Sequence, residues 1–413
     1  MLNYIDLFAG AGGFSEGFNN AGFTPVAHVE MDEAACNTLR TRIACNYLKA
    51  TGKVDRYIAY LKSEINRDEL YASIPKEEMD SVINLAVGKA NNDKIFRLID
   101  ERLNGSKVDL IVGGPPCQAY SLVGRATSAT GMKGDERNFL YLEYAKFLHR
   151  YKPKVFVFEN VIGLHSADNG GYFRKMLLTF KNLGYDIKDF VVAARECGVL
   201  QDRKRIILIG YRQGVRIEDI ELKGSASNYS VSTVLNDLPA MMAGQGLDKY
   251  TGYVGPTNEY LEQSGIRGEI QVITQHLSRQ QSIQDKQIYR IAIKKWNKGQ
   301  QRLNYNDLPD ELKTHTKRDI FTDRFKVVAG DLNTSQTVVA HIAKDGHYYI
   351  HPDIKQCRSI TVREAARLQS FPDDYYFEGE KEGSNRTAAF KQIGNAVPPL
   401  MARRIAEEIK KYL

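Results

Sequence analysis

Cysteine and long apolar runs are scarce in this chain of 413 residues, and each shortage excludes a class of protein. The five cysteines are an odd number, are scattered and include no C-x-x-C pair, which argues against a disulfide framework and a zinc site. The longest apolar runs, such as KVFVF and RIILIG, are far shorter than the roughly 20 residues of a membrane-spanning helix. The N-terminal residues contain no basic region, apolar block or small-residue cleavage site. We therefore expect a cytoplasmic protein without a metal, in which any functional cysteine acts as a thiol.

The charge is mildly positive and unevenly distributed. A net charge of +7 is compatible with a polyanionic partner and does not establish one. Residues 261–330 contain 13 Lys and Arg against 8 Asp and Glu, so five of the seven excess positive charges fall there. This segment is the candidate nucleic-acid face, and an ordinary solvated surface is the alternative.

The order of apolar runs predicts a doubly wound α/β sheet. YIDLF, a glycine turn, the helical FSEGFNNAGF and the strand-like TPVAHVE form a βαβ unit within the first 30 residues. Four further strand-like segments follow, with helical segments between or beside them: KVDLIV (107–112), KVFVF (154–158), DIKDFVVAA (186–194) and RIILIG (205–210). This alternation is typical of a sheet that helices cover.

The length predicts more than one domain, since domains usually contain roughly 100–200 residues. Residues after Tyr211 are polar, rich in glutamine and without regular alternation until about residue 357. SITVREAARLQ then predicts a helix with a capping box of Thr361 and Glu364, and the C-terminal helix is expected to return to the first domain. The predicted divisions are 1–210, 211–357 and 358–413, with 40–106 as a helical insertion or variant crossover that lacks a clean strand.

The glycine turn after the first strand is the first candidate binding element. DLFAGAGGFSEGF sets Gly10, Gly12, Gly13 and Gly17 between a strand and a helix, where bare backbone can approach a ligand. The spacing G-x-G-G-x-x-x-G differs from the dinucleotide fingerprint and suits a nucleoside that bears a carboxylate. Glu30 ends the second strand, where an acid would bind ribose hydroxyls. A glycine turn alone fits a purely structural role equally well.

Three more motifs lie at strand ends. GGPPCQAYS holds Cys117 on a stiff loop just beyond a strand, which makes this thiol a candidate nucleophile. KVFVF ends in Glu159, whose carboxylate is expected to face the same pocket. QDRKR places Arg203 and Arg205 two residues apart at the start of a strand, so that both side chains point to one face. Taken singly, each motif also has a purely structural explanation. Cys117 could be a buried structural cysteine, Glu159 could cap the next helix, and the two arginines could lie on a solvated sheet edge.

Together and in order, these motifs resemble those of the DNA (cytosine-5)-methyltransferases that use S-adenosylmethionine, most like prokaryotic modification enzymes. The resemblance extends to RSITVREAARLQSFPDDY (358–375) and QIGNAVPP (392–399). It implies a Rossmann-like S-adenosylmethionine-dependent catalytic domain over 1–210 and a smaller target-recognition domain over 211–357. Residues 358–413 would supply the family's last conserved helix and a segment that returns to the catalytic domain.

The resemblance also implies individual roles. Cys117 would be the nucleophile, Glu159 would contact nitrogen 3 of the target cytosine, and Arg205, with Arg203 supporting, would steady that base. Positions that match the surroundings of the cofactor in the family are Asp6, Phe8, Gly10, Gly12, Glu30, Met31, Pro116, Leu140 and Asn395. Many members have tryptophan where this chain has Met31, and the acid that contacts adenine is unassigned within 40–106.

The expected partner is double-stranded DNA, with the target cytosine flipped out of the helix. A monomer is expected, and a cognate restriction endonuclease would act on the same DNA without a stable complex. A tRNA cytosine methyltransferase is the nearest alternative, although Arg205 and Arg358 are 153 positions apart, farther than in the tRNA enzymes that the chain resembles. A non-catalytic DNA-binding protein on the same fold and a nicotinamide-dependent oxidoreductase are the others.

Overall fold

The computed structural model describes residues 2–116, 139–212, 214–215, 219–224, 226–316, 318–319, 321–383 and 385–413. Within them a seven-stranded sheet has the order β3-β2-β1-β4-β5-β7-β6, in which only β7 runs antiparallel to its neighbours. Its strands are β1 (Asn3–Leu7), β2 (Thr24–Glu30), β3 (Val82–Asn84), β4 (Leu110–Gly113), β5 (Val155–Asn160), β6 (Tyr185–Ala193) and β7 (Lys204–Arg212). The prediction of a doubly wound α/β sheet is confirmed.

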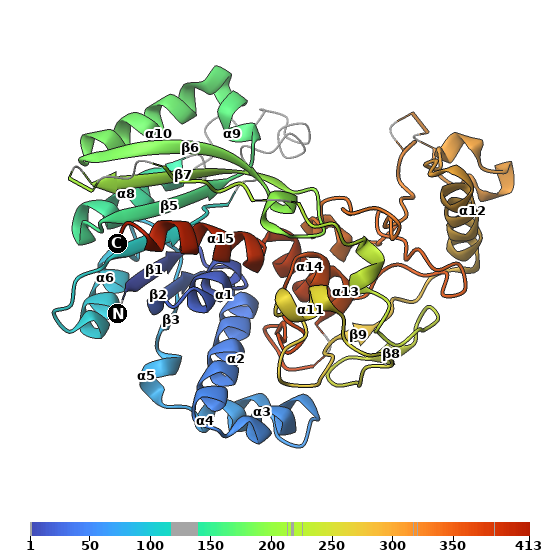
Figure 1. Ribbon diagram of the computed structural model, residues 1–413, viewed down its shortest axis with the longest axis horizontal. Coiled ribbons are helices and arrows are strands. Elements are labelled where there is room, and N and C mark those ends of the chain that lie inside the picture. The colour runs from blue at the N-terminus through green and yellow to red at the C-terminus, as the bar shows by residue number, and fades with distance from the viewer. Residues whose placement is uncertain are drawn as a thin grey trace.

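Helices cover both faces of this sheet, which is why its strands are nearly continuous apolar runs (Figure 1). Helices α1 (Gly13–Asn20) and α15 (Pro399–Lys410) pack on one face. Helices α6 (Asn92–Leu103), α8 (Leu140–Tyr151) and α10 (Gly171–Asn182) pack on the other face. The short helix α9 (Gly163–Ser166) precedes α10.

The segment 40–106 contains a strand that the sequence analysis did not predict. Its helices are α2 (Glu33–Ala50), α3 (Val54–Leu61), α4 (Arg67–Ala72) and α5 (Lys76–Met79), followed by β3 and α6. The expectation of no clean strand was wrong because β3 has only three residues, too few to show a periodicity. The strand pairs in parallel with β2 and forms one edge of the sheet.

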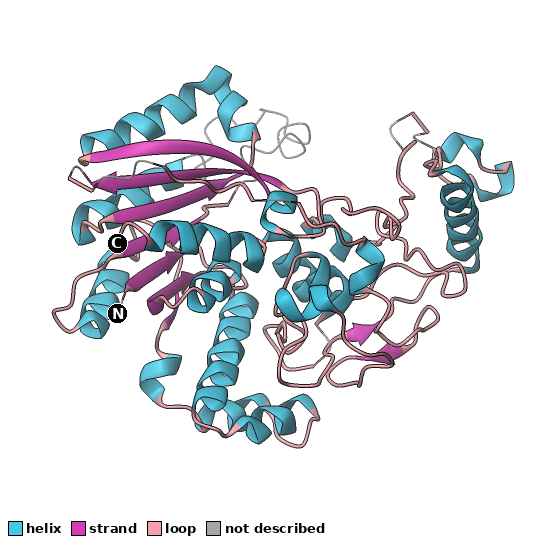
Figure 2. Ribbon diagram, in the orientation of Figure 1, coloured by secondary structure: helices cyan, strands magenta, loops and turns pink. Residues whose placement is uncertain are grey.

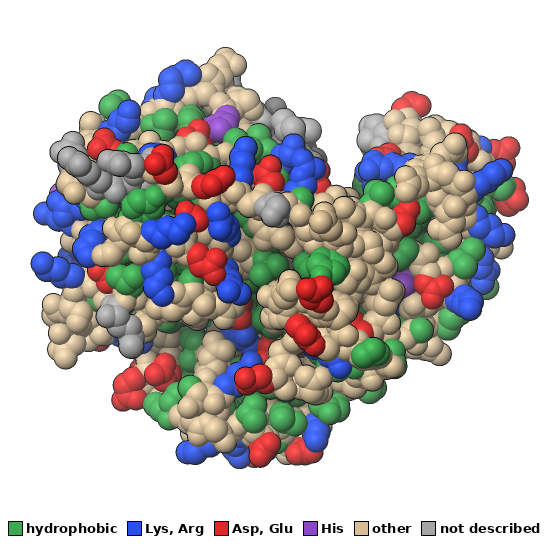
Figure 3. All heavy atoms as spheres, viewed as in Figure 1, with side chains coloured by type: hydrophobic (Ala, Val, Ile, Leu, Met, Phe, Trp, Pro, Cys, Tyr) green, Lys and Arg blue, Asp and Glu red, His purple; other side chains and the backbone are tan. Residues whose placement is uncertain are grey.

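The described residues of 211–357, which we call the lobe, are built mostly of loops and lie beside the part of the molecule that carries the sheet, which we call the body (Figure 2). The regular elements of the lobe are α11 (Glu259–Gln263), α12 (Ile283–Gly299) and the two-residue strands β8 (Gly246–Leu247) and β9 (His276–Leu277). Figure 3 shows a deep hollow between the body that carries the sheet and the part of the lobe that carries α12. No described helix is long and apolar enough to cross a bilayer.

The C-terminal segment runs back from the lobe to the sheet. Helix α13 (Val362–Leu368) begins with the predicted capping box, in which Thr361 accepts from the backbone N–H of Glu364 and Glu364 from that of Thr361. Helix α14 (Arg386–Asn395) follows, and α15 packs on α1 through Met401, Ile405 and Ile409. Short 3-10 helices occupy Ala167–Gly170, Ala194–Cys197, Val231–Val234, Tyr305–Asp307, Asp310–Leu312 and Ala340–Ala343.

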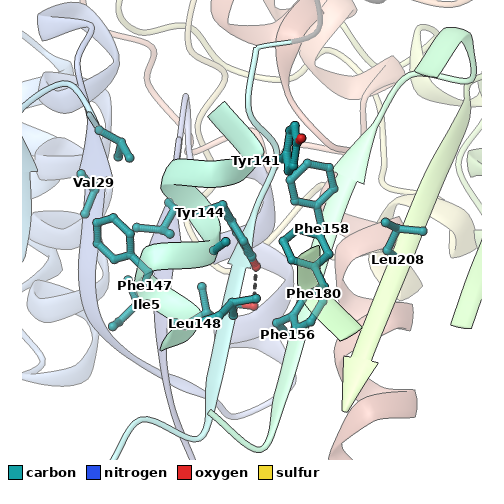
Figure 4. Packing of buried hydrophobic residues seen from close by; sticks show 14 of the residues in the cluster. Ile5, Val29, Tyr141, Tyr144, Phe147, Leu148, Phe156, Phe158, Phe180 and Leu208 are labelled. Atoms are coloured by element: carbon teal, nitrogen blue, oxygen red, sulfur yellow. Dashed lines mark hydrogen bonds between the residues drawn. The ribbon is translucent and has the colours of Figure 1, made fainter. Parts of the chain in front are cut away.

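The core under α8 and α10 is largely aromatic. Tyr144 of α8 lies among Phe156, Phe158 and Phe180, with ring centroids 5.3 to 6.1 Å apart (Figure 4). Its hydroxyl donates to the backbone carbonyl groups of neighbouring strands, so the ring is buried without an unpaired polar group. This packing keeps β4 and β5 rigid, and both strands end at the candidate site.

Candidate active site

The predicted site residues lie at one edge of the sheet. The carboxyl ends of β1, β2, β4 and β5 meet there because these strands are parallel. Strand β7 is antiparallel to β5, so its first residues reach the same edge, with Ile206 opposite Asn160 in the register. The topology therefore brings the segments around Phe8, Glu30, Glu159 and Arg205 together from distant parts of the sequence.

Glu159 and Arg205 form an ion pair at this edge. Arg205 Nε lies 2.7 Å from Glu159 Oε1, and each side chain is 13% exposed. The other carboxylate oxygen, Oε2, faces Gly114: a Cβ atom added to that glycine would lie only 2.5 Å from it. Because residue 114 is a glycine, no side chain at that position covers Oε2, while Arg205 holds Oε1.

The environment of Glu159 shifts the pKa of its carboxyl group upward. Burial raises the pKa of Glu159 above its ordinary value, and the positive charges of Arg205 and Arg203 act in the opposite direction. A carboxyl group of this kind can donate a proton or hydrogen bond at a pH where an exposed glutamate is fully ionised.

Arg203 contributes to the site in a different way from Arg205. Its guanidinium is fully buried, and its terminal nitrogens donate to the carbonyl groups of Val338, at 2.9 Å, and Gly394, at 3.1 Å. The residues before β7 also pair with the loop that precedes Val338, through the bond from Asp202 N to Ser335 O at 2.9 Å. Arg203 thus ties the start of β7 to the lobe and to the end of α14.

The loop after β4 is attached to the end of β5. Asn160 Nδ2 donates to the carbonyl oxygen of Pro115 at 3.3 Å, and Asn160 Oδ1 accepts from Val161 N at 2.9 Å. Pro116 is exposed at this edge. The predicted nucleophile, Cys117, lies outside the described residues, one position beyond the end of this attached loop.

Glu30 closes the glycine turn. Its carboxylate accepts from the backbone N–H groups of Gly10 and Met31, each at 2.8 Å, and of Asp32, at 2.9 Å. Burial raises the pKa of Glu30, and these hydrogen bonds oppose the shift. Gly10 has a φ of 53° and no atom within 4 Å of the position of a Cβ, and Met31 beside it is 66% exposed. The turn is thus rigid and open on the side of Gly10.

The other glycines of the turn face the protein itself. A Cβ at Gly13 would collide with the carbonyl oxygen of Val397, and one at Gly17 would lie 2.5 Å from the Cβ of Ala402. A Cβ at Gly12 would lie 2.7 Å from Leu39. Our interpretation that all four glycines admit a ligand therefore needs correction: at Gly13 and Gly17 the close approach is made by the C-terminal segment.

The remaining predicted positions surround the same edge. Asp6 is buried in β1 and accepts from Ser15 Oγ at 2.6 Å, and Phe8 has a left-handed backbone with φ 58°. Leu140 is the first residue of α8 and is half-buried, and Asn395 is the exposed last residue of α14. No group of three or more His, Cys, Asp or Glu in the described part of the chain is arranged to hold a metal.

Asn84 is a candidate site residue that sequence reasoning did not name. It ends β3 and is paired with Glu30 in the register, so an exposed amide stands beside the glycine turn. The only sequence signal for β3 is the pair of apolar residues Val82 and Ile83, which is too short to identify a strand. The structure thereby offers a polar group from within 40–106, although it is an amide and not the acid that was sought.

With this geometry in place, comparison with known proteins identifies the class. The family model for C-5 cytosine-specific DNA methylases matches residues 2–75 and 83–411. The chain belongs to this family, and it is an enzyme that methylates carbon 5 of cytosine in DNA. The resemblance stated from the sequence motifs is thereby confirmed, and the family implies a methyl donor of the S-adenosylmethionine type.

Similar proteins span the whole chain. The type II methyltransferase M.Bpa9945I of Bacillus paralicheniformis is 41% identical over 446 residues, which cover 99% of this chain and 98% of the relative. M1.HphI of Haemophilus parahaemolyticus is 31% identical, with 99% and 87% covered. An Escherichia coli prophage protein described as a DNA modification methyltransferase has a similar fold, with a TM-score of 0.66 at 22% identity over 100% of this chain and 99% of that one.

Proposed function

We propose that the enzyme flips a cytosine out of a specific duplex sequence and methylates it from S-adenosylmethionine, through a temporary covalent bond to Cys117. The observation that carries this proposal is the pair formed by Glu159 and Arg205, next to the attached loop that leads to Cys117. The pair places a carboxyl group, whose pKa burial raises, and a fixed cation at one point of the sheet edge.

The cysteine is needed because carbon 5 of cytosine belongs to an aromatic ring and is a poor nucleophile. Addition of the Cys117 thiolate to carbon 6 would form a carbon–sulfur bond and move electrons toward carbon 5. Carbon 5 would then be nucleophilic enough to take the methyl group of the sulfonium donor, whose methyl–sulfur bond would break to leave a neutral thioether. A base then removes the proton from carbon 5, and elimination returns the thiolate. A thiol has an ordinary pKa of about 8.5, so a nearby cation such as Arg205 would favour the anion.

Glu159 would act on the opposite side of the ring. Addition at carbon 6 moves negative charge toward nitrogen 3, and a hydrogen bond or proton from Glu159 there lowers the barrier. The uncovered oxygen Oε2 is the candidate donor, since Arg205 occupies Oε1. Arg203 is a positioning residue because its guanidinium bonds to the carbonyl groups of Val338 and Gly394.

The residues around the glycine turn fit a nucleoside cofactor. S-adenosylmethionine supplies a sulfonium methyl group when it is bound. Glu30, held by three backbone donors, would accept from ribose hydroxyls, and the open face of Gly10 leaves room for the chain of the ligand. Met31 would offer an apolar surface to adenine, and Asn84 a hydrogen-bonding amide. Asp6, Phe8, Gly12, Pro116, Leu140 and Asn395 complete the proposed surroundings.

We assign functions to the three predicted divisions. Residues 1–210 would carry out catalysis, residues 211–357 would recognise the target sequence, and residues 358–413 would return to the catalytic domain. Flipping the base costs a few kcal/mol, which contacts between the lobe and the duplex would offset. The type II methyltransferases among the relatives support a role in restriction and modification. We propose a monomer in the prokaryotic cytoplasm, with a cognate endonuclease that forms no stable complex with it.

Trapping tests the covalent step. Duplex DNA with 5-fluorocytosine at the target should become covalently linked to the wild-type enzyme, because fluorine cannot leave as the proton does. Cys117→Ser should bind the same duplex, form no adduct and lose turnover. Cys197→Ser, a change of the same residue type away from the site, should form the adduct normally. Undiminished methylation by Cys117→Ser would refute the proposed nucleophile.

Radiolabel transfer separates the proposal from its nearest alternative. The enzyme is incubated with labelled S-adenosylmethionine and either duplex DNA or tRNA. We expect label in the duplex, and label in tRNA alone would overturn the choice of substrate.

A further inference from the structure

A cavity of about 370 Å³ lies between α12, the loop that follows it and the segment 325–337. Its volume falls within the range of about 300–1,000 Å³ that is common for ligand pockets. Residues from both the lobe and the body line it, among them Asp202, Trp296, Gln301, Arg302, Phe325 and Gln336.

The cavity is close to the catalytic edge of the sheet. Asp202 forms part of its wall and stands three positions before Arg205, which contacts Glu159. The bonds of Asp202 N to Ser335 O and of Ser335 N to Leu200 O hold this wall in place. A duplex whose target cytosine reaches Glu159 would therefore present neighbouring base pairs here.

Two polar side chains of the lining have unused hydrogen-bonding capacity. Trp296 Nε1 donates to Asp331 at 2.8 Å and Gln336 Nε2 to Tyr348 O at 2.6 Å, so these groups are parts of fixed walls. Gln301 makes no side-chain hydrogen bond to another described residue. Arg302 is 62% exposed, and it forms an ion pair with Asp323 at 3.8 Å but no side-chain hydrogen bond within the described part of the chain.

The chemistry of the lining favours a base edge over a phosphate. Arg302 and Lys326 of the lining offer donors that suit either a phosphate or a base edge. The carboxylate of Asp202, which pairs with Arg195 at 3.6 Å, is an acceptor and has no use for a phosphate, which offers only acceptors. A base edge carries both donors and acceptors, which the mixed lining of carboxylate, amide and guanidinium groups can match. The guanidinium fork of arginine fits O6 and N7 of guanine, and a glutamine amide fits N6 and N7 of adenine.

We propose that Gln301 and Arg302 read the recognition sequence next to the target cytosine, with Arg302 selecting a guanine. This inference rests on the proposed function, since it concerns the same duplex. Within the proposed target-recognition region 211–357, it narrows specificity to the segment that leaves α12 and names the two side chains that would read bases.

Methylation of a random duplex library, read by bisulfite sequencing, tests the assignment. Arg302→Ala should lose roughly 10- to 100-fold discrimination for guanine at one position and keep the other positions of the recognition sequence. Gln301→Ala should relax a different position. Arg290→Ala removes the same charge from an exposed site of α12 outside the cavity, and it should leave the sequence preference unchanged.

Each result has a defined meaning. A preference that stays intact in Arg302→Ala while the rate falls uniformly would overturn base reading and indicate a phosphate contact. An unchanged rate and preference would also overturn it. Failure of the wild-type enzyme to methylate any duplex would instead contradict the proposed function, so the two failures are distinguishable.

Discussion

The body and the lobe hold their polar side chains in different ways. In the body, Glu30, Asn84 and Glu159 stand at strand ends, where backbone register sets their positions. In the lobe the strands among the described residues have two residues each, and Gln301 and Arg302 lie in a loop with few partners. The comparison teaches that a regular sheet suits groups whose geometry must be constant, whereas an irregular lobe can vary the groups that select a sequence.

Buried ion pairs attach helix α13 to the lobe. Arg367 of α13 donates to Asp237 Oδ1 of the lobe at 2.5 Å and to Asp373 Oδ2 at 2.6 Å. Arg358 forms a bidentate pair with Glu364 of the same helix, with both bonds at 2.7 Å. Loss of one partner would leave an uncompensated buried charge, at a cost of about 3–5 kcal/mol. These pairs therefore fix α13 against the lobe.

The largest effect should follow a change of chemistry in the body. Glu159→Gln removes the titratable group and should lower kcat by about 10²–10³ on every duplex sequence alike. Steady-state kinetics on several duplexes measure the change, and Glu407→Gln on the exposed face of α15 is the control. If kcat falls only on some duplex sequences, Glu159 acts in sequence selection, and the body does not supply the same chemistry to every target.

Glycine substitutions compare the packing of the two regions. Gly17→Ala would force a Cβ against Ala402 in α15 and should lower the free energy of unfolding by about 2 kcal/mol. Gly299→Ala, in the lobe at the end of α12, meets no atom within 4 Å and should be neutral or stabilising by up to about 1 kcal/mol. Urea unfolding measures both, and equal effects would contradict the packing of α15 on α1.

A smaller effect is expected when the pH is lowered around the buried cluster of His351, Arg358 and Glu364. Burial lowers the pKa of His351 to about 4, against an ordinary value of about 6.5. Between these values the unfolded chain binds a proton that the folded chain does not, so stability falls as pH falls from 6.5 to 4. His351→Gln should make this loss shallower by up to about 1.4 kcal/mol per pH unit.

Urea unfolding at pH 7, 6 and 5 follows that slope. The exposed residue His149, on α8, serves as the control site, and His149→Gln should follow the wild-type curve. If the free energy of unfolding of His351→Gln changes with pH as steeply as that of the wild type, the stability does not depend on this histidine.

Much of the body was predictable because its signals are local. Apolar runs located six of the seven strands, and the capping box located the start of α13. The positions of Glu30 and Glu159 at strand ends followed from the same runs. Strand β3 and Asn84 were missed, since three residues in a helical stretch leave no periodicity.

The glycine turn marks the limit of such reasoning. The spacing of its glycines indicated a tight turn, and only the structure separates Gly10, which faces open space, from Gly13 and Gly17, which face residues almost 400 positions away. A glycine has the same appearance in a sequence whether a ligand or a distant helix approaches it.

The sequence by itself determined the family, the order of its motifs and the strands that carry them, because these depend on residue types and spacings close together along the chain. Tertiary structure decided that Arg205 contacts Glu159 while Arg203 holds the lobe, and that a cavity opens beside them. Those outcomes depend on antiparallel pairing and on segments more than 100 residues apart, and no local pattern encodes such contacts.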